Sequence, residues 1–112
     1  MSKYDFTSPE SAAKSMLEIN SEVDVRANLE ISRHRNGGST SEILRTVEVN
    51  KVADYQDKKI VFVSYLQNGK KKKETLTFEK NLESKLWMPV TLLPYSIEDS
   101  NAELAKEMRE WE

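Results

Sequence analysis

Apolar and polar residues alternate one for one in several stretches of this chain, which is typical of β-strands with one buried face. The clearest stretch runs from Val23 to Ile31, where Asp, Arg, Asn or Glu separates successive apolar residues. Alternation returns within residues 42–53, 59–67, 72–80 and 85–93. The pattern predicts about five strands, the first over residues 22–34. A helix is the alternative for that first stretch, because several of its residues are good helix formers.

Two of the predicted strands differ from the others. Residues 59–67 and 85–93 are apolar on both faces, whereas residues 22–34 and 72–80 have one polar face. A strand that is apolar on both faces is usually central and covered on both sides. Pro89 favours an edge or a bulge for the last strand. We therefore expect the second face of the sheet to be covered by a helix or by a partner.

Asn68-Gly69 lies between two predicted strands and is the strongest short signal for a β-hairpin. A two-residue loop would place Val61 opposite Leu76. A turn with a glycine bulge would instead place Ile60 opposite Leu76, and the apolar residues of the returning strand would join the other face. We favour the two-residue loop.

Two helices are predicted, over residues 8–20 and 97–111. Ser8 is a good N-cap and Pro9 suits the first helical position. Helical spacing then gives each segment an apolar stripe. The stripes consist of Ala12, Ala13, Met16, Leu17 and Ile19 in the first segment, and of Ile97, Asn101, Leu104, Ala105, Met108 and Trp111 in the second. The predicted fold is therefore α+β: an N-terminal helix packed on a curved antiparallel meander of about five strands, plus a C-terminal helix.

Composition narrows the class of protein. The 112 residues favour a single domain over residues 1–112. The chain has no cysteine, which excludes disulfides and thiolate chemistry, and its net charge of −2 gives no general attraction to nucleic acid. We expect no membrane span, since the apolar runs are only a few residues long. The first residues lack a signal-peptide pattern, which slightly favours the cytoplasm, with a trimmed exported protein as the alternative.

Several of these segments resemble a known superfamily. Ser8-Pro9-Glu10-Ser11-Ala12-Ala13, the run Val61–Tyr65, and Thr75–Phe78 followed by Trp87 are similar to segments of the nuclear-transport-factor-2-like superfamily, whose fold is called cystatin-like. The resemblance implies a curved sheet wrapped on a helix, frequent dimers through the sheet, and often a pocket between helix and sheet. The chain departs from the family in residues 22–34, where helices are usual, and in its added C-terminal helix.

Few residues suggest chemistry. Lys70–Lys73 form the only charge run, and Arg33 and Arg35 flank the single histidine, His34. Arg33, Arg35, Lys71 and Lys73 are candidate anion contacts, although lysines on a hairpin more often keep a strand edge from pairing with other chains. One histidine and scattered carboxylates suggest neither a catalytic site nor a metal site, and we expect no cofactor. Asp24 or Glu48 could serve an enzyme only if its side chain points into a cavity.

The remaining candidates concern binding. Met16, Tyr65 and Trp87 could line a pocket, and Leu104, Met108 and Trp111 could form a partner interface if the C-terminal helix projects from the sheet. The favoured function is a non-catalytic binding or assembly domain that forms a homodimer or binds a protein partner through its sheet or C-terminal helix. The alternatives are a small pocket enzyme or ligand carrier of the cystatin-like type, and an anion- or nucleic-acid-contacting module.

Overall fold

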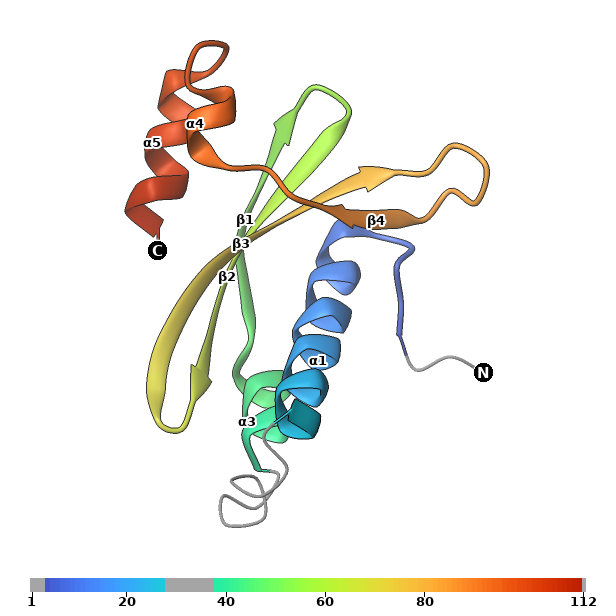
Figure 1. Ribbon diagram of the computed structural model, residues 1–112, viewed down its shortest axis with the longest axis vertical. Helices are drawn as coiled ribbons and strands as arrows, with labels where there is room; N and C mark the ends of the chain where they lie inside the picture. The colour runs from blue at the N-terminus through green and yellow to red at the C-terminus, as the bar shows by residue number, and fades with distance from the viewer. Residues whose placement is uncertain (1–3, 28–37, 112) are drawn as a thin grey trace.

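A computed structural model of the chain describes residues 4–27 and 38–111, which form an α+β fold (Figure 1). Helices lie on both sides of one antiparallel sheet. In chain order the elements are α1 (Pro9–Ala27), α3 (Gly38–Thr46), β1 (Glu48–Tyr55), β2 (Lys58–Gln67), β3 (Lys70–Lys80), β4 (Trp87–Val90), α4 (Pro94–Ile97) and α5 (Ala102–Trp111). No helix within the described residues is long and apolar enough to cross a membrane.

The sheet in this part of the chain has four strands in the order β1-β2-β3-β4, so the expectation of about five was too high. Every neighbouring pair is antiparallel. β2 lies between β1 and β3, as its two apolar faces predicted, and β4 with Pro89 lies at an edge. Val61 pairs with Leu76, which confirms the two-residue loop at Asn68-Gly69.

The predicted strand over residues 22–34 is wrong where the structure describes it. Residues 22–27 are the last part of α1, and residues 28–34 lie outside the described residues. A helix that has already nucleated gains a hydrogen bond for each residue it adds, whereas a strand needs a neighbour to pair with. The long amphipathic start of α1 therefore carries the helix through the alternating sequence.

The predicted strand over residues 42–53 begins too early. Residues up to Thr46 belong to α3, and β1 begins at Glu48. The N–H of Val47 donates to the carbonyl of Ile43 at 2.9 Å, as at the end of a helix. A spacing of four residues fits both an alternating strand and one turn of a helix, so Ile43 and Val47 did not distinguish the two.

The predicted helix termini are partly confirmed. Ser8 caps α1, because its Oγ accepts the N–H of Ser11 at 3.2 Å. The predicted helix 97–111 begins too early, because Ile97 ends the short α4 and α5 begins only at Ala102. The Oδ1 of Asn101 accepts the N–H of Leu104 at 3.1 Å. Asn101 is therefore a cap at the start of α5 and not part of its apolar stripe. The predicted strand 85–93 is shortened to β4.

Two apolar cores lie on opposite faces of the sheet. The α1 core joins α1 and α3 to one face, and the α5 core joins α4 and α5 to the other (Figure 1). The buried members of the α1 core are Ala12, Ala13, Leu17, Ile43, Val61, Val63, Tyr65 and Phe78. Those of the α5 core are Ile60, Phe62, Ile97, Leu104, Ala105 and Met108. β2 supplies alternate residues to both, so the chain itself covers its two-sided strand.

Candidate functional site

The β2–β3 hairpin extends beyond the strands that flank it. β1 pairs with β2 only as far as Ser64, and β4 pairs with β3 only from Thr77 onward. Residues 65–76 therefore project as a two-stranded hairpin arm, with its tip beside α3 (Figure 1). The arm is formed by local sequence: Asn68 and Gly69 have φ values of 55° and 77°, as a type I′ turn requires.

The β2 side of the hairpin arm is capped by α3. The Oγ1 of Thr46 accepts the N–H of Leu66 at 2.9 Å. The Glu42 carboxylate accepts the N–H groups of Asn68 at 2.6 Å and Gly69 at 3.2 Å. Glu42 and Thr46 lie four residues apart, on one face of α3. The outward N–H of Leu66, which β1 leaves unpaired, and the two N–H groups of the turn thus have side-chain acceptors on α3.

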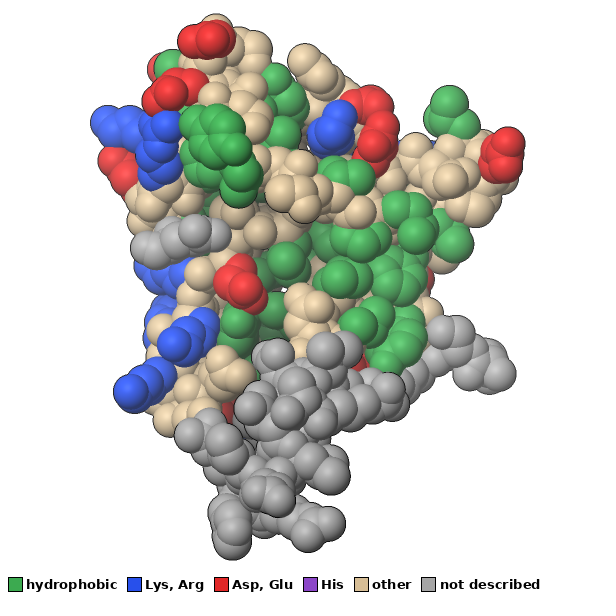
Figure 2. Space-filling view, in the orientation of Figure 1, with side chains coloured by type: hydrophobic (Ala, Val, Ile, Leu, Met, Phe, Trp, Pro, Cys, Tyr) green, Lys and Arg blue, Asp and Glu red, His purple; other side chains and the backbone are tan. Residues whose placement is uncertain are grey.

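The β3 side of the arm is different. Among the described residues, no strand pairs with the outer side of Lys70–Leu76, which we call the open edge. Lys70, Lys71, Lys72 and Lys73 are all exposed, and Lys/Arg side chains gather along this margin of the molecule in Figure 2. Lys71 and Lys73 share one face and Lys70 and Lys72 the other, as strand geometry requires. The open edge therefore combines unpaired backbone with dense positive charge.

An apolar groove adjoins the open edge where β4 leaves β3. A cavity of about 250 Å³ lies there, lined from α1, β3 and the segment that ends β4. Apolar side chains form most of its wall, including Met16, Leu76, Val90 and Leu93, and Leu93 is 43% exposed. Figure 2 shows a patch of apolar side chains over α1 and β4. The groove and the open edge are continuous, because Thr75 and Leu76 belong to both.

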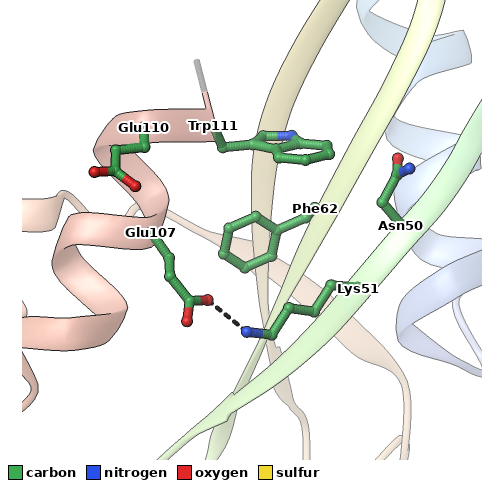
Figure 3. Close-up of a pocket in the computed structure, with 6 residues that line it drawn as sticks. All are labelled: Asn50, Lys51, Phe62, Glu107, Glu110 and Trp111. Carbon is green, nitrogen blue, oxygen red and sulfur yellow. Dashed lines mark hydrogen bonds and ion pairs between the residues drawn. The ribbon is translucent and has the colours of Figure 1, made fainter.

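A second cavity, of about 290 Å³, lies beneath α5 (Figure 3). It is lined by Asn50, Lys51, Phe62, Glu107, Glu110 and Trp111. Two aromatic rings with nearby carboxylates suit a cationic group. That position is already taken, because the Lys51 Nζ lies 5.7 Å from the centroid of the Phe62 ring and forms an ion pair with Glu107. The contacts between these lining residues therefore attach α5 to β1 and β2.

The three predicted pocket residues do not share one cavity. Met16 lines the groove beside β4, whereas Tyr65 lines a cavity of about 360 Å³ between α3 and the arm. Trp87 packs against the α1 core. Glu48 lines the same cavity as Tyr65, together with Arg45 and Lys71. The side chain of Asp24 lies outside the part of the chain that the structure describes.

The predicted partner interface lies against the protein's own sheet. Leu104 and Met108 are buried in the α5 core, and Trp111 packs beside them. The Trp111 Nε1 donates to the carbonyl oxygens of Val63 at 3.0 Å and Glu74 at 3.1 Å. The C-terminal helix thus packs within the chain.

Of the predicted anion contacts, Arg33 and Arg35 lie outside the described residues, as does His34. Lys71 and Lys73 lie on the exposed arm, and the Lys73 Nζ is 4.8 Å from the centroid of the Trp111 ring. Within residues 4–27 and 38–111, no group of three or more His, Cys, Asp or Glu side chains could hold a metal ion.

The perturbed ionisable groups lie away from the arm. At the β1–β2 turn, a hydrogen bond from the Lys58 ammonium, with a smaller contribution from Glu79, lowers the pKa of Asp57. The same contact raises the pKa of Lys58. Near the N-terminus, the Thr7 hydroxyl and N–H donate to Asp5 and lower its pKa. All three groups stay charged at neutral pH and stabilise turns.

The sequence did not predict two features: the hydrogen bonds from the hairpin arm to Glu42 and Thr46 of α3, and the groove beside β4. A helical interpretation of residues 38–46 would have placed Glu42 and Thr46 on one face. The groove gave no local signal in the sequence, since its residues come from three separate segments.

Comparison with known protein families, with individual proteins and with solved structures finds no match to this chain. The resemblance to the nuclear-transport-factor-2-like superfamily therefore stays a prediction.

Proposed function

We propose that this chain is a non-catalytic protein-binding domain and that its binding surface is the open edge of the hairpin arm. The carrying observation is the difference between the two sides of the arm. On the β2 side, Thr46 accepts the outward N–H of Leu66, and Glu42 accepts the N–H groups of the turn residues Asn68 and Gly69. On the β3 side, no described residue does so along Lys70–Leu76. Natural proteins commonly cover or blunt free edges, and an edge left open beside an apolar groove suits a partner.

The lysines determine which partners the edge accepts. Four consecutive lysines repel a second cationic segment and attract an acidic one. Pairing between two copies of β3 would bring the lysines of both edges together, which disfavours self-association here. The two-sided strand that suggested a dimer is covered by α1 and α5 of the same chain. An acidic partner protein is therefore favoured over a homodimer.

The alternative of a ligand carrier has less support. The described cavities are at or below the small end of the range of about 300–1,000 Å³ that is usual for small-molecule sites. Two of the charged groups beneath α5 are paired with each other, namely Lys51 and Glu107.

An anion- or nucleic-acid-contacting module would bind through the same lysines that we propose for the protein partner. A binding experiment can therefore separate these two functions.

Selection from a random peptide display library tests the proposal. We expect wild-type protein to enrich acidic sequences, and the double variant Lys71→Glu/Lys73→Glu to lose them. Lys85→Glu is the matched control, because Lys85 is an exposed lysine outside the arm. Equal enrichment on the double variant, or no enrichment on wild type, would contradict the proposal. Preferential binding of single-stranded nucleic acid over every selected peptide would favour the anion-contacting module.

A further inference from the structure

We infer that the partner segment binds in an extended conformation and adds to the sheet as a strand alongside β3, with acidic side chains toward Lys71 and Lys73 and an apolar side chain in the groove beside β4. This inference rests on the proposed function and specifies the conformation and chemistry of the partner. Three features of the arm carry it: the direction of the unpaired backbone groups, the distribution of charge, and the position of the groove.

The direction of the backbone groups follows from the hairpin register. In an antiparallel ladder, alternate residues direct their N–H and C=O groups to the same neighbour. The two-residue loop makes Gln67 and Lys70 a hydrogen-bonded pair, so Lys72 and Glu74 also bond to β2. Lys71, Lys73 and Thr75 then direct their backbone groups outward. These three residues present the donors and acceptors that an added strand requires.

β4 demonstrates the same geometry further along β3. Thr77 and Glu79 are the next outward-facing residues by this parity, and they pair with Val90 and Met88 of β4. β4 then leaves the sheet as the chain turns toward α4 at Pro94. A segment added at Thr75, Lys73 and Lys71 would continue the line of β4 past this point. An antiparallel direction matches the existing sheet and is slightly the more stable per residue.

Charge and shape then define the side chains of the added strand. Residues directly opposite each other in a ladder lie on the same face. Acidic residues opposite Lys71 and Lys73 would therefore lie on the α5 side of the sheet. The alternate residues would lie on the α1 side, where the groove offers Met16 and Leu76. The best partner thus alternates acidic and apolar residues and begins with an apolar residue at the groove.

A peptide with alternating glutamate and valine and a leading leucine is the probe. We expect it to bind wild-type protein, measured by fluorescence anisotropy at low salt. The Lys71→Glu/Lys73→Glu variant should bind about tenfold or more weakly, and Lys85→Glu should bind as wild type. A second peptide has the same sequence, but the backbone nitrogen of the glutamate opposite Lys73 is methylated. Methylation keeps the charge and removes an N–H that would pair with Lys73, so we expect this peptide to lose most of the affinity.

Amide hydrogen exchange, followed by NMR, locates the contact. Binding should slow exchange at Lys71, Lys73 and Thr75 and leave Lys72 and Glu74 almost unchanged, since these are already bonded to β2. Binding of both peptides with equal affinity, or without this alternating protection, would overturn strand addition but leave the binding function intact. No binding of either peptide, at any salt concentration, would overturn both. Sedimentation of the free protein should show a monomer, and a dimer protecting the same amides would identify a second copy as the occupant.

Discussion

The ring of Trp111 stands edge-on to the ring of Phe62, with their centroids 5.7 Å apart and their planes at 79°. This contact joins the end of α5 to the centre of β2. The indole N–H also bonds to the backbone carbonyls of Val63 and Glu74, so the side chain contributes both apolar contact and hydrogen bonds.

Replacing Trp111 should therefore loosen α5. We expect Trp111→Ala to lower the free energy of unfolding by about 2 to 3 kcal/mol, less than for a fully buried tryptophan because the side chain is partly exposed. Trp111→Phe keeps an aromatic ring but removes the donor, and should cost about 1 kcal/mol. Urea denaturation measures both. Glu110→Ala, beside Trp111, should stay within about 0.5 kcal/mol of wild type. An equal loss in the Glu110 and Trp111 variants would contradict this role.

The Glu42 carboxylate should stabilise the tip of the hairpin arm. Glu42→Ala removes the acceptor for two backbone N–H groups, and we expect a loss of about 1 kcal/mol in urea denaturation. Glu42→Gln keeps one acceptor oxygen and should lose less. Hydrogen exchange at Asn68 and Gly69 should accelerate in the alanine variant. Glu83→Ala, an exposed glutamate in the β3–β4 loop, is the control and should leave both amides unaffected.

Gly69 should resist substitution for a conformational reason alone. Its φ is +77°, and an added Cβ would have nothing within 4 Å. Gly69→Ala should therefore cost about 1 kcal/mol through backbone strain without any clash. Asn68→Gly removes a side chain at a second positive φ and should change stability by less than about 0.5 kcal/mol. If Gly69→Ala proved neutral by thermal and urea denaturation, the type I′ turn would be contradicted.

The carboxyl of Asp57 should titrate below its ordinary value, because Lys58 donates a hydrogen bond to its charged form. A lowered pKa in the folded state stabilises the protein above the pKa of the unfolded chain, about 3.9. That stabilisation is lost as the pH falls through the lower pKa of the folded state. The raised pKa of Lys58 matters at high pH. The stability that the charged Lys58 contributes is complete below the pKa of the unfolded chain, about 10.4, and is lost as the pH rises through the higher pKa of the folded state.

Carboxyl-detected NMR titration of Asp57 measures this shift directly. Lys58→Met should return the midpoint toward its ordinary value. Lys59→Met is the matched control, since Lys59 forms its ion pair with Asp54 and should leave Asp57 unchanged. A wild-type midpoint at the ordinary value would show that the Lys58 contact does not persist in solution.

The parts of the fold that the sequence predicted best are those decided by local chemistry. Ser8 and Pro9 start α1, and Asn68-Gly69 fixes both the hairpin and its register. The alternation in residues 22–27 was misleading because an existing helix extends more easily than an unpaired strand forms. Where spacing suited both structures, as at Ile43 and Val47, only the tertiary context decides.

The candidate site was predicted only in part. Lys71 and Lys73 were identified from the charge run, and β2 was identified as needing cover on both faces. The sequence could not show that α5 would supply that cover, because an amphipathic helix presents the same face to its own sheet and to a partner. The open edge was also hidden, since it depends on where β4 stops relative to the length of β3.

The division of β2 between two cores has a consequence for synthesis on the ribosome. The α1 core can assemble once β3 has emerged, because its buried residues end at Phe78. Ile60 and Phe62 must wait for Leu104, Ala105 and Met108 before their face is covered. During that interval the nascent chain exposes an apolar sheet face to solvent or to chaperones, which is the usual condition for misassembly. The closing turns of α5 are therefore the point at which the newly made chain stops being vulnerable to aggregation.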